Sequence, residues 1–240
     1  MMKFAKVLAA LGLGLGSMLG FAERSSAEQN PITAIDIALE PDATMIQHAE
    51  AVNARLMKVF PKGFALGPTH HPHISILQRY VRTDDLEKVY AAAGAVLANE
   101  KPASWKLKAF KYYFIPWKDI GLAGIVVEPT DNLLKLQQKL IDAVAPYTAQ
   151  TGTAAAFVTT PDDPDINQPT IDYVETFVPK ASGKNFNPHV TVGIATEDYL
   201  KKMLAEPFDA FTFSPSGASV YQLGNFGTAR KKLTTWDLKS

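Results

Sequence analysis

Two tetrads, His73-Ile74-Ser75-Ile76 and His189-Val190-Thr191-Val192, decide how this chain is expected to fold. Each reads histidine, aliphatic, hydroxyl, aliphatic, and each follows a proline. Successive side chains of a β-strand point to opposite faces, so the histidine and the hydroxyl share one face while the aliphatic residues enter the core. Two imidazoles and two hydroxyls presented in the same way indicate acid–base chemistry on an anionic centre.

The pattern around the tetrads alternates strands with helices. Apolar spacing and capping residues predict helices over 42–60, 83–99, 129–144 and 196–204. Strands are expected over 32–39, 73–81, 105–115, 122–127, 154–159, 171–179, 189–192, 211–223 and 229–238. The run Gly224-Asn225-Phe226-Gly227 predicts a hairpin between the last two strands.

The two halves of the chain repeat one order of elements. Each has a tetrad strand, a helix and two further strands, and the two histidines lie 116 residues apart. A pseudo-two-fold axis would bring the tetrads face to face across a cleft. The expected architecture is therefore α+β and bilobed, with antiparallel sheets lining a central cleft and helices packed outside.

The first 27 residues predict a secretory signal peptide. Lys3 and Lys6 precede an apolar, glycine-rich run, and small residues follow it, so cleavage is expected after Ala27 or, less favourably, after Ala22. The apolar run is shorter than the roughly 20 residues of a membrane-spanning helix, which argues against the alternative of a stable membrane anchor. We expect residues 28–240 to form one bilobed domain, periplasmic or secreted.

Composition limits the classes of partner. Without residues 1–27 the chain carries 21 basic and 23 acidic residues, a net charge of −2, so a broad positive surface for long nucleic acids is not expected. The sequence contains no cysteine, which excludes disulfides and thiolate chemistry. We expect a monomer that acts on a small molecule or on the end of a polymer.

The tetrads, the order of elements and the closing glycine-rich hairpin resemble the 2H phosphoesterase superfamily, also called 2′,5′-RNA ligase-like or cyclic phosphodiesterase-like proteins. The hallmark of that family is two His-hydrophobic-Thr/Ser-hydrophobic motifs, one in each lobe, and the resemblance covers the chain after the signal peptide. It implies a bilobed α+β fold and hydrolysis of 2′,3′-cyclic phosphates of nucleotides or RNA ends, without metal or other cofactor.

The residues fit that chemistry. Opening a cyclic phosphodiester needs one base to activate water and one acid to protonate the departing oxygen, and His73 and His189 are the candidates for both roles. Ser75 and Thr191 can donate hydrogen bonds to the phosphate oxygens, where negative charge builds. Which histidine is the acid remains open at this stage.

Other residues are weaker candidates for contacts with the substrate. The candidates for contacts with the phosphate or the leaving group are Arg79, Lys184 and Arg230, although each is individually more typical of a surface charge. The candidates for stacking on a nucleobase are Tyr112, Tyr113, Trp117 and Phe226, although aromatic residues in strands are more often part of the core.

Four alternatives are less favoured: a zinc site, a calcium site, a binding module and an RNA ligase. The run His70-His71-Pro72-His73 could hold zinc, but a loop with surface histidines beside one catalytic histidine is the preferred interpretation. Asp162, Asp163 and Asp165 lack the glycine and glutamate of a calcium loop. The alternative function is a non-catalytic binding module for a phosphorylated or cyclic nucleotide; an RNA ligase is suggested only by the family's name.

Overall fold

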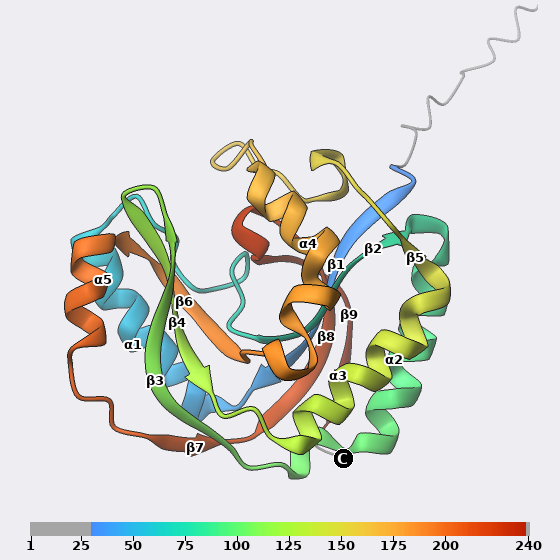
Figure 1. Ribbon diagram of the computed structural model, residues 1–240, viewed down its shortest axis with the longest axis horizontal. Helices are drawn as coiled ribbons and strands as arrows, with labels where there is room; N and C mark the ends of the chain where they lie inside the picture. The colour runs from blue at the N-terminus through green and yellow to red at the C-terminus, as the bar shows by residue number, and fades with distance from the viewer. Residues whose placement is uncertain (1–29, 239–240) are drawn as a thin grey trace, which may run out of the picture.

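The computed structural model describes residues 30–238 (Figure 1). The expected signal peptide over 1–27, with cleavage after Ala22 or Ala27, lies outside the described residues. In the described part, no helix combines the length and the apolar character needed to cross a bilayer.

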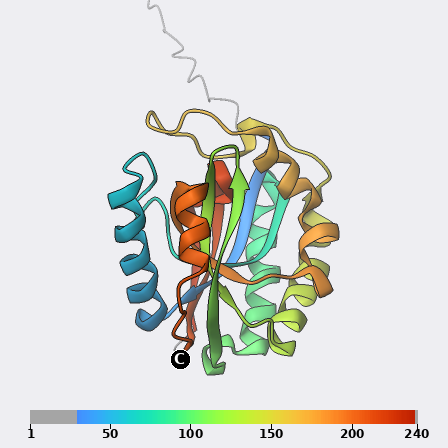
Figure 2. The same ribbon diagram turned by 60° about the vertical axis from the view of Figure 1, so that its left-hand side comes forward.

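One curled antiparallel sheet forms the centre of the molecule, with helices on its outer side and one helix, α4 (Gln168–Ala181), over its concave side (Figures 1 and 2). In sheet order its strands are β7 (Phe211–Phe213), β3 (Leu107–Trp117), β4 (Ile120–Val127), β6 (His189–Thr196), β2 (Ile74–Arg82), β1 (Ile32–Pro41), β8 (Pro215–Leu223) and β9 (Ala229–Asp237). The short strand β5 (Thr148–Ala149) pairs with β2 off this path. The helices are α1 (Ala43–Val59), α2 (Leu86–Glu100), α3 (Asp131–Val144), α4 (Gln168–Ala181) and α5 (Glu197–Leu204).

The sheet confirms the predicted pseudo-two-fold arrangement. The orders β1-α1-β2-α2-β3 and β4-α3-β6-α5-β8 repeat each other. In the sheet, β2, β1 and β8 follow one another outward from the middle on one side, and their counterparts β6, β4 and β3 do so on the other side. The last strand of each repeat is exchanged, because β3 pairs with β4 and β8 pairs with β1. The two motif strands meet in the middle through the pair Ile74 and Val190.

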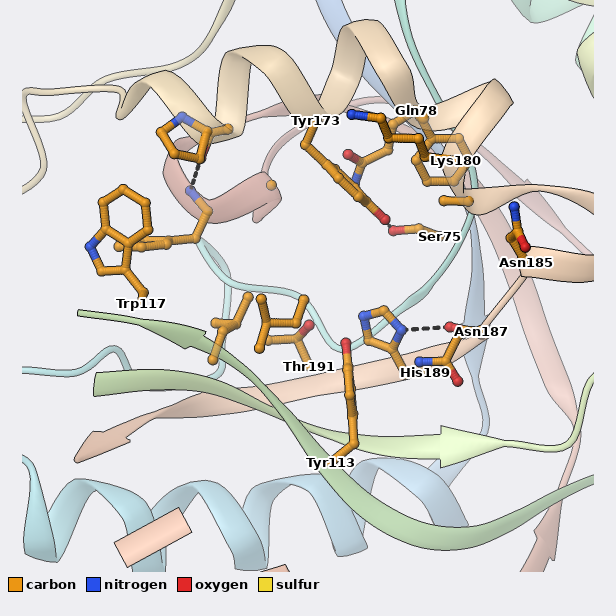
Figure 3. Close-up of a pocket in the computed structure, with 18 of the residues that line it drawn as sticks. Ser75, Gln78, Tyr113, Trp117, Tyr173, Lys180, Asn185, Asn187, His189 and Thr191 are labelled. Carbon is orange, nitrogen blue, oxygen red and sulfur yellow. Dashed lines mark hydrogen bonds between the residues drawn. The ribbon is translucent and has the colours of Figure 1, made fainter. Parts of the chain in front are cut away.

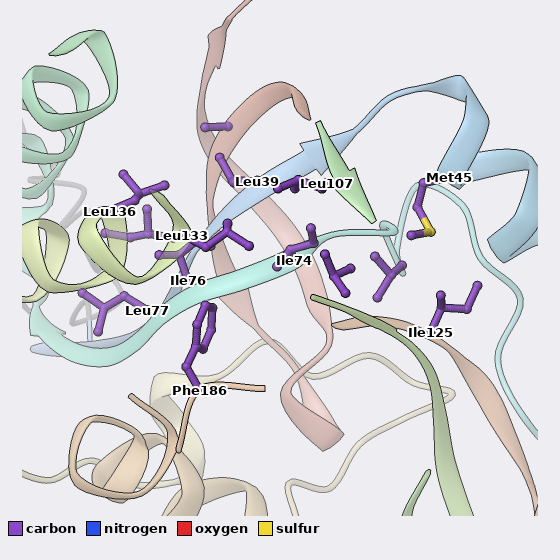
Figure 4. Packing of buried hydrophobic residues seen from close by; sticks show 14 of the residues in the cluster. Leu39, Met45, Ile74, Ile76, Leu77, Leu107, Ile125, Leu133, Leu136 and Phe186 are labelled. Carbon is purple, nitrogen blue, oxygen red and sulfur yellow. The ribbon is translucent and has the colours of Figure 1, made fainter. Parts of the chain in front are cut away.

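The aliphatic residues of the tetrads enter the core, as their alternation predicts. Ile74, Ile76 and Val190 are fully buried. Figure 4 shows Ile76 beside Leu133 and Leu136 of α3, the apolar face that the helical spacing predicted. The Thr130 hydroxyl accepts a hydrogen bond from the Leu133 amide and so begins this helix.

Each motif strand carries a β-bulge at the last residue of its tetrad. The pairing of β1 with β2 skips Ile76, and the pairing of β4 with β6 skips Val192. The unpaired carbonyls are satisfied by two buried amide side chains. Gln137 Nε2 donates to the Ile76 carbonyl at 3.0 Å, and Asn53 Nδ2 donates to the Val192 carbonyl at 2.9 Å.

The same two amides also hold the loops that lead into the tetrads. Gln137 bonds the Ala181 carbonyl at 3.4 Å and accepts from the Gly183 amide at 3.0 Å, just before the second tetrad.

Asn53 makes the matching pair of contacts before the first tetrad, with the Phe64 carbonyl at 2.9 Å and the Leu66 amide at 3.1 Å. We call these two residues the amide clamps. Each ties one motif strand to the loop before the other motif.

Three expectations were wrong. The segment 171–179 lies within helix α4, where Val174 and Phe177 are buried at helical spacing and the Asn167 side chain caps the first turn. The segment 154–159 holds a single 3₁₀ turn, Ala154–Ala156.

The expected strand 211–223 is divided at Ser214, whose amide donates to Asp42 Oδ2 at 2.8 Å. This break lets β7 pair with β3 while β8 pairs with β1.

Candidate functional site

A cavity of about 440 Å³ lies between the two lobes and contains all four polar residues of the tetrads, His73, Ser75, His189 and Thr191 (Figure 3). Its walls come from β2, β6, the β3–β4 hairpin, helix α4 and the turn around Phe226. Its size suits a nucleotide-sized ligand.

Both histidines are oriented by their own backbone in the same way. His73 Nδ1 lies 2.6 Å from the carbonyl of His71, and His189 Nδ1 lies 2.7 Å from the carbonyl of Asn187. A carbonyl only accepts, so both Nδ1 atoms carry the hydrogen. In each ring Nε2 is therefore the nitrogen left for proton transfer.

His73 is 7% exposed and lies beside the fully buried carboxylate of Asp36. Its Nε2 is 3.4 Å from Asp36 Oδ2. Burial opposes protonation, but the hydrogen bond and charge of Asp36, the His71 carbonyl and the charge of Glu40 outweigh it, so the pKa of His73 lies above its ordinary value.

His189 has a less polar environment. The ring of Tyr113 contacts it edge-on, with 4.7 Å between centroids. Burial and the charge of His73 outweigh the Asn187 carbonyl and the charge of Asp36, and lower the pKa of His189 to about 4. At neutral pH His189 is an uncharged base, whereas His73 is the more readily protonated ring.

The two motif hydroxyls also differ. Ser75 donates its hydrogen to Asp36 Oδ2, which Gln78 Nε2 approaches at 3.1 Å. A hydroxyl has one hydrogen, so Ser75 cannot donate to an anion while this bond persists. Thr191 lines the cavity, and within residues 30–238 its hydroxyl has no hydrogen-bond partner.

The cavity has an aromatic end and a polar end (Figure 3). Trp117 and Phe226 form the aromatic end, edge to face with 6.1 Å between centroids. Lys180, Asn185 and Asn187 line the polar end.

The structure separates the weaker candidates for substrate contacts. Tyr113 lines the cavity, whereas Arg79, Lys184 and Arg230 are not among its lining residues. The bulge at Ile76 reverses the alternation along β2, so that Gln78 faces the cavity in place of Arg79.

Arg230 bonds Asp163 at 2.7 Å and His70 Nε2 at 3.0 Å behind the Phe226 turn. Lys184 lies in an exposed 3₁₀ turn. Of the other aromatic candidates, Tyr112 packs against Phe208 and does not line the cavity.

The histidine run does not converge on one point. His70 stacks on Phe64, with 4.3 Å between ring centroids, while His73 faces Asp36. Asp163 is engaged by Arg230 rather than grouped with its neighbours Asp162 and Asp165. Across residues 30–238, no three His, Asp or Glu side chains gather as a metal site.

Several residues of the cavity lining, and the buried Asp36 beside His73, were missed from the sequence. Asp36 and Gln78 had a signal, since each is polar within an otherwise apolar strand segment. Tyr173 had none, because its segment was expected to be a strand, and Lys180 follows directly after that segment. Helix α4 turns both side chains toward the cavity.

No family model matches the sequence, and no curated protein matches it. Among solved structures, the protein TT0787 of Thermus thermophilus is similar over 87% of this chain and 99% of its own, with a TM-score of 0.52 and 17% identity. E. coli LigT complexed with 3′-AMP is similar over 88% of this chain and 100% of its own, with 12% identity and a TM-score of 0.42. The first likeness shows the fold alone. The chain therefore shares the fold of TT0787, and this fold is the bilobed α+β arrangement that the tetrads predicted.

Proposed function

We propose that this protein is a metal-independent phosphodiesterase that hydrolyses 2′,3′-cyclic phosphates of nucleotides or RNA ends by two-histidine acid–base catalysis. The observation that carries the proposal is the pair of imidazoles in one cavity, each with Nδ1 fixed by a carbonyl and Nε2 left for proton transfer. One ring favours the protonated state and the other the neutral state, as an acid and a base require.

The rest of the cavity supports a nucleotide as ligand. Thr191 offers a hydroxyl donor next to the histidines, where a phosphate would lie. Trp117 and Phe226 provide an apolar surface on which a base could stack. Lys180, Asn185 and Asn187 can meet polar groups of the sugar or of a further phosphate.

The test is turnover of the four 2′,3′-cyclic nucleoside monophosphates, followed by chromatography of the products. Acid–base catalysis contributes about 10²- to 10⁴-fold, so His73→Gln and His189→Gln should each lower kcat by at least about 100-fold. His48→Gln is the matched control, because this exposed histidine stacks on Phe211 outside the cavity and should leave kcat unchanged.

Wild-type rates in either cavity variant would refute the proposal. Binding of the nucleotides without any product would instead identify a binding module. Activity should also survive EDTA, and its loss on chelation would favour a metal-dependent reaction.

We also propose export and a monomeric state for the mature protein. The basic and apolar residues before position 28 support export, and the near-neutral charge after it supports a small substrate rather than a long nucleic acid. Mass spectrometry of protein from the periplasmic fraction should find a chain that begins after Ala27 or Ala22. Light scattering should give the mass of one chain.

A further inference from the structure

The pseudo-two-fold axis allows the two halves of the cavity to be compared residue by residue. Beyond the bulge of the first motif strand, Asp36 pairs with Gln78. At the equivalent place in the other half, Leu122 pairs with Ile194. The axis therefore relates a buried carboxylate beside His73 to an aliphatic side chain, Leu122, that lines the other half of the cavity.

The Asp36 carboxylate is bound mainly by residues of the first motif strand. Its Oδ2 atom accepts from Ser75 Oγ and from Gln78 Nε2, and lies 3.4 Å from His73 Nε2. Within the described chain, its buried Oδ1 atom has no hydrogen-bond partner. A buried carboxylate is costly unless a positive charge accompanies it, and His73 is the cationic partner within reach.

The fixed tautomer gives this contact a direction. His73 Nδ1 already donates to a carbonyl, so in the neutral ring Nε2 would turn a lone pair toward Asp36 Oδ2. Protonation of Nε2 replaces that repulsion with an ion pair. The separation of 3.4 Å is longer than a normal hydrogen bond, so this hydrogen stays available to a substrate oxygen in the cavity. His189 Nε2 has the same tautomer but an apolar counterpart of Asp36, so its neutral form is not disfavoured in this way.

We propose that Asp36 is a positioning residue that makes His73 the proton donor and leaves His189 as the proton acceptor. This inference rests on the proposed function, and it adds the direction of proton flow and the place of the leaving group. The leaving oxygen would lie on the β2 side of the cavity, next to His73. The attacking water would lie on the β6 side, next to His189 and Tyr113.

Other titratable groups also surround the two rings, and among them Glu40 acts on His73 in the same direction as Asp36. The groups near His73 are Glu40 on β1, His71, Tyr221 on β8 and His189 on β6. Glu40 is engaged by Lys232, Ser219 and Tyr221. Those near His189 are His73, Asp36 and Tyr113 on β3, and α4 adds Tyr173 and Lys180 to the same cavity.

The reaction balances with water as the only co-reactant. His189 Nε2 takes a proton from water as the water oxygen forms its bond to phosphorus. The bond from phosphorus to the ribose oxygen breaks, and that oxygen keeps the electron pair and takes the proton from His73 Nε2. The product is a phosphomonoester, and solvent returns the proton from His189 to His73.

The first test needs no activity. The two imidazoles are titrated by NMR in the full chain, with signals assigned from His73→Gln and His189→Gln. In wild type, His73 should titrate above His189. Asp36→Asn should lower the His73 titration by at least one pH unit, while Asp142→Asn, which removes an exposed carboxylate on α3, should leave it in place. An unmoved His73 in Asp36→Asn would overturn the inference, even if the protein proved to be a phosphodiesterase.

The second test separates an electrostatic role from a merely structural one. For a cyclic nucleotide, the ratio of wild-type to Asp36→Asn kcat should stay within about threefold at pH 5.5 and approach about tenfold at pH 8, because the variant loses the His73 proton at lower pH. A ratio that does not change with pH would show that Asp36 only supports the fold.

A third comparison fixes which histidine is the acid. A diester with 4-nitrophenolate as leaving group needs no proton donor, so His73→Gln should retain turnover within about tenfold of wild type while His189→Gln loses it. The opposite pattern would reverse the assignment. Absence of wild-type turnover on both substrates, with the titrations as expected, would refute the proposed function but not the effect of Asp36 on His73.

Discussion

Replacement of Gln137 by methionine tests how the motif strands are held. Gln137 is 1% exposed, and methionine matches its length and shape while removing all three of its hydrogen bonds. The bulge leaves the Ile76 carbonyl without a partner on β1, so this buried acceptor loses the Gln137 bond that satisfies it. A buried polar group without a partner costs about 1–3 kcal/mol.

The other two bonds of Gln137 involve a more exposed loop, where water can replace the lost partners, and they add about 1 kcal/mol. The apolar thioether offsets part of the loss, about 1 kcal/mol. The expected net loss is about 1–3 kcal/mol in the free energy of unfolding, which lowers Tm by roughly 2–12 °C for a chain of this size.

Urea unfolding followed by tryptophan fluorescence measures this loss as a lower midpoint with an unchanged slope. The matched control is Gln138→Met on the next position of α3, an exposed amide that bonds Asp142 and should change stability by less than about 0.5 kcal/mol. Equal stabilities of the two variants would refute the clamp as a stabilising element.

Three further predictions concern the cavity and its surroundings. In Gly124→Ala the new Cβ would lie 2.6 Å from Cε1 of Tyr113, so the Tyr113 ring must shift from its place against His189. The circular dichroism spectrum should stay native while kcat falls about tenfold. An unchanged kcat would contradict a role for the contact between Tyr113 and His189. Trp117→Ala should raise KM for a cyclic nucleotide about 5- to 100-fold with little change in kcat, as loss of one base stack worth about 1–3 kcal/mol implies; an unchanged KM would place the base elsewhere. Burial lowers the pKa values of His70 and His189 to about 4 in the folded state. Between pH 6.5 and 4 the unfolded chain therefore binds more protons, and the free energy of unfolding decreases as the pH is lowered. In urea titrations His70→Gln should make this decrease smaller, and an identical decrease would argue against a buried neutral ring at position 70.

The tetrads and the apolar periodicity were sufficient to predict the architecture. Alternation placed Ile74 and Val190 in the core, and the apolar spacing in 131–144 identified the face that α3 buries. The segment 171–179 was misjudged because its valine, threonine and aromatic residues favour strands locally. Burial of Val174 and Phe177 on one face outweighs that preference, and such burial depends on contacts distant in sequence.

The site was predictable only in part. The four tetrad residues that share the cavity were identified, because strand alternation is a local property. Arg79, named as a possible substrate contact, does not line the cavity. The bulge at Ile76 that turns it away depends on the partner strand and on Gln137 from a distant helix. The role proposed for Asp36 depends on a comparison of the two halves of the structure, in which the pseudo-two-fold axis relates Asp36 to Leu122.

The exchange of β3 and β8 between the repeats has a consequence for any attempt to divide the chain. A cut in the turn between Trp117 and Ile120 would separate β3 from β4 and would also separate β1 from β8. Each fragment would expose an unpaired sheet edge, and neither would contain a whole lobe. The two fragments should therefore be insoluble or unfolded alone and should regain structure only when they are mixed. If the chain arose by duplication, the ancestral half-length unit would have had to function as a strand-swapped dimer.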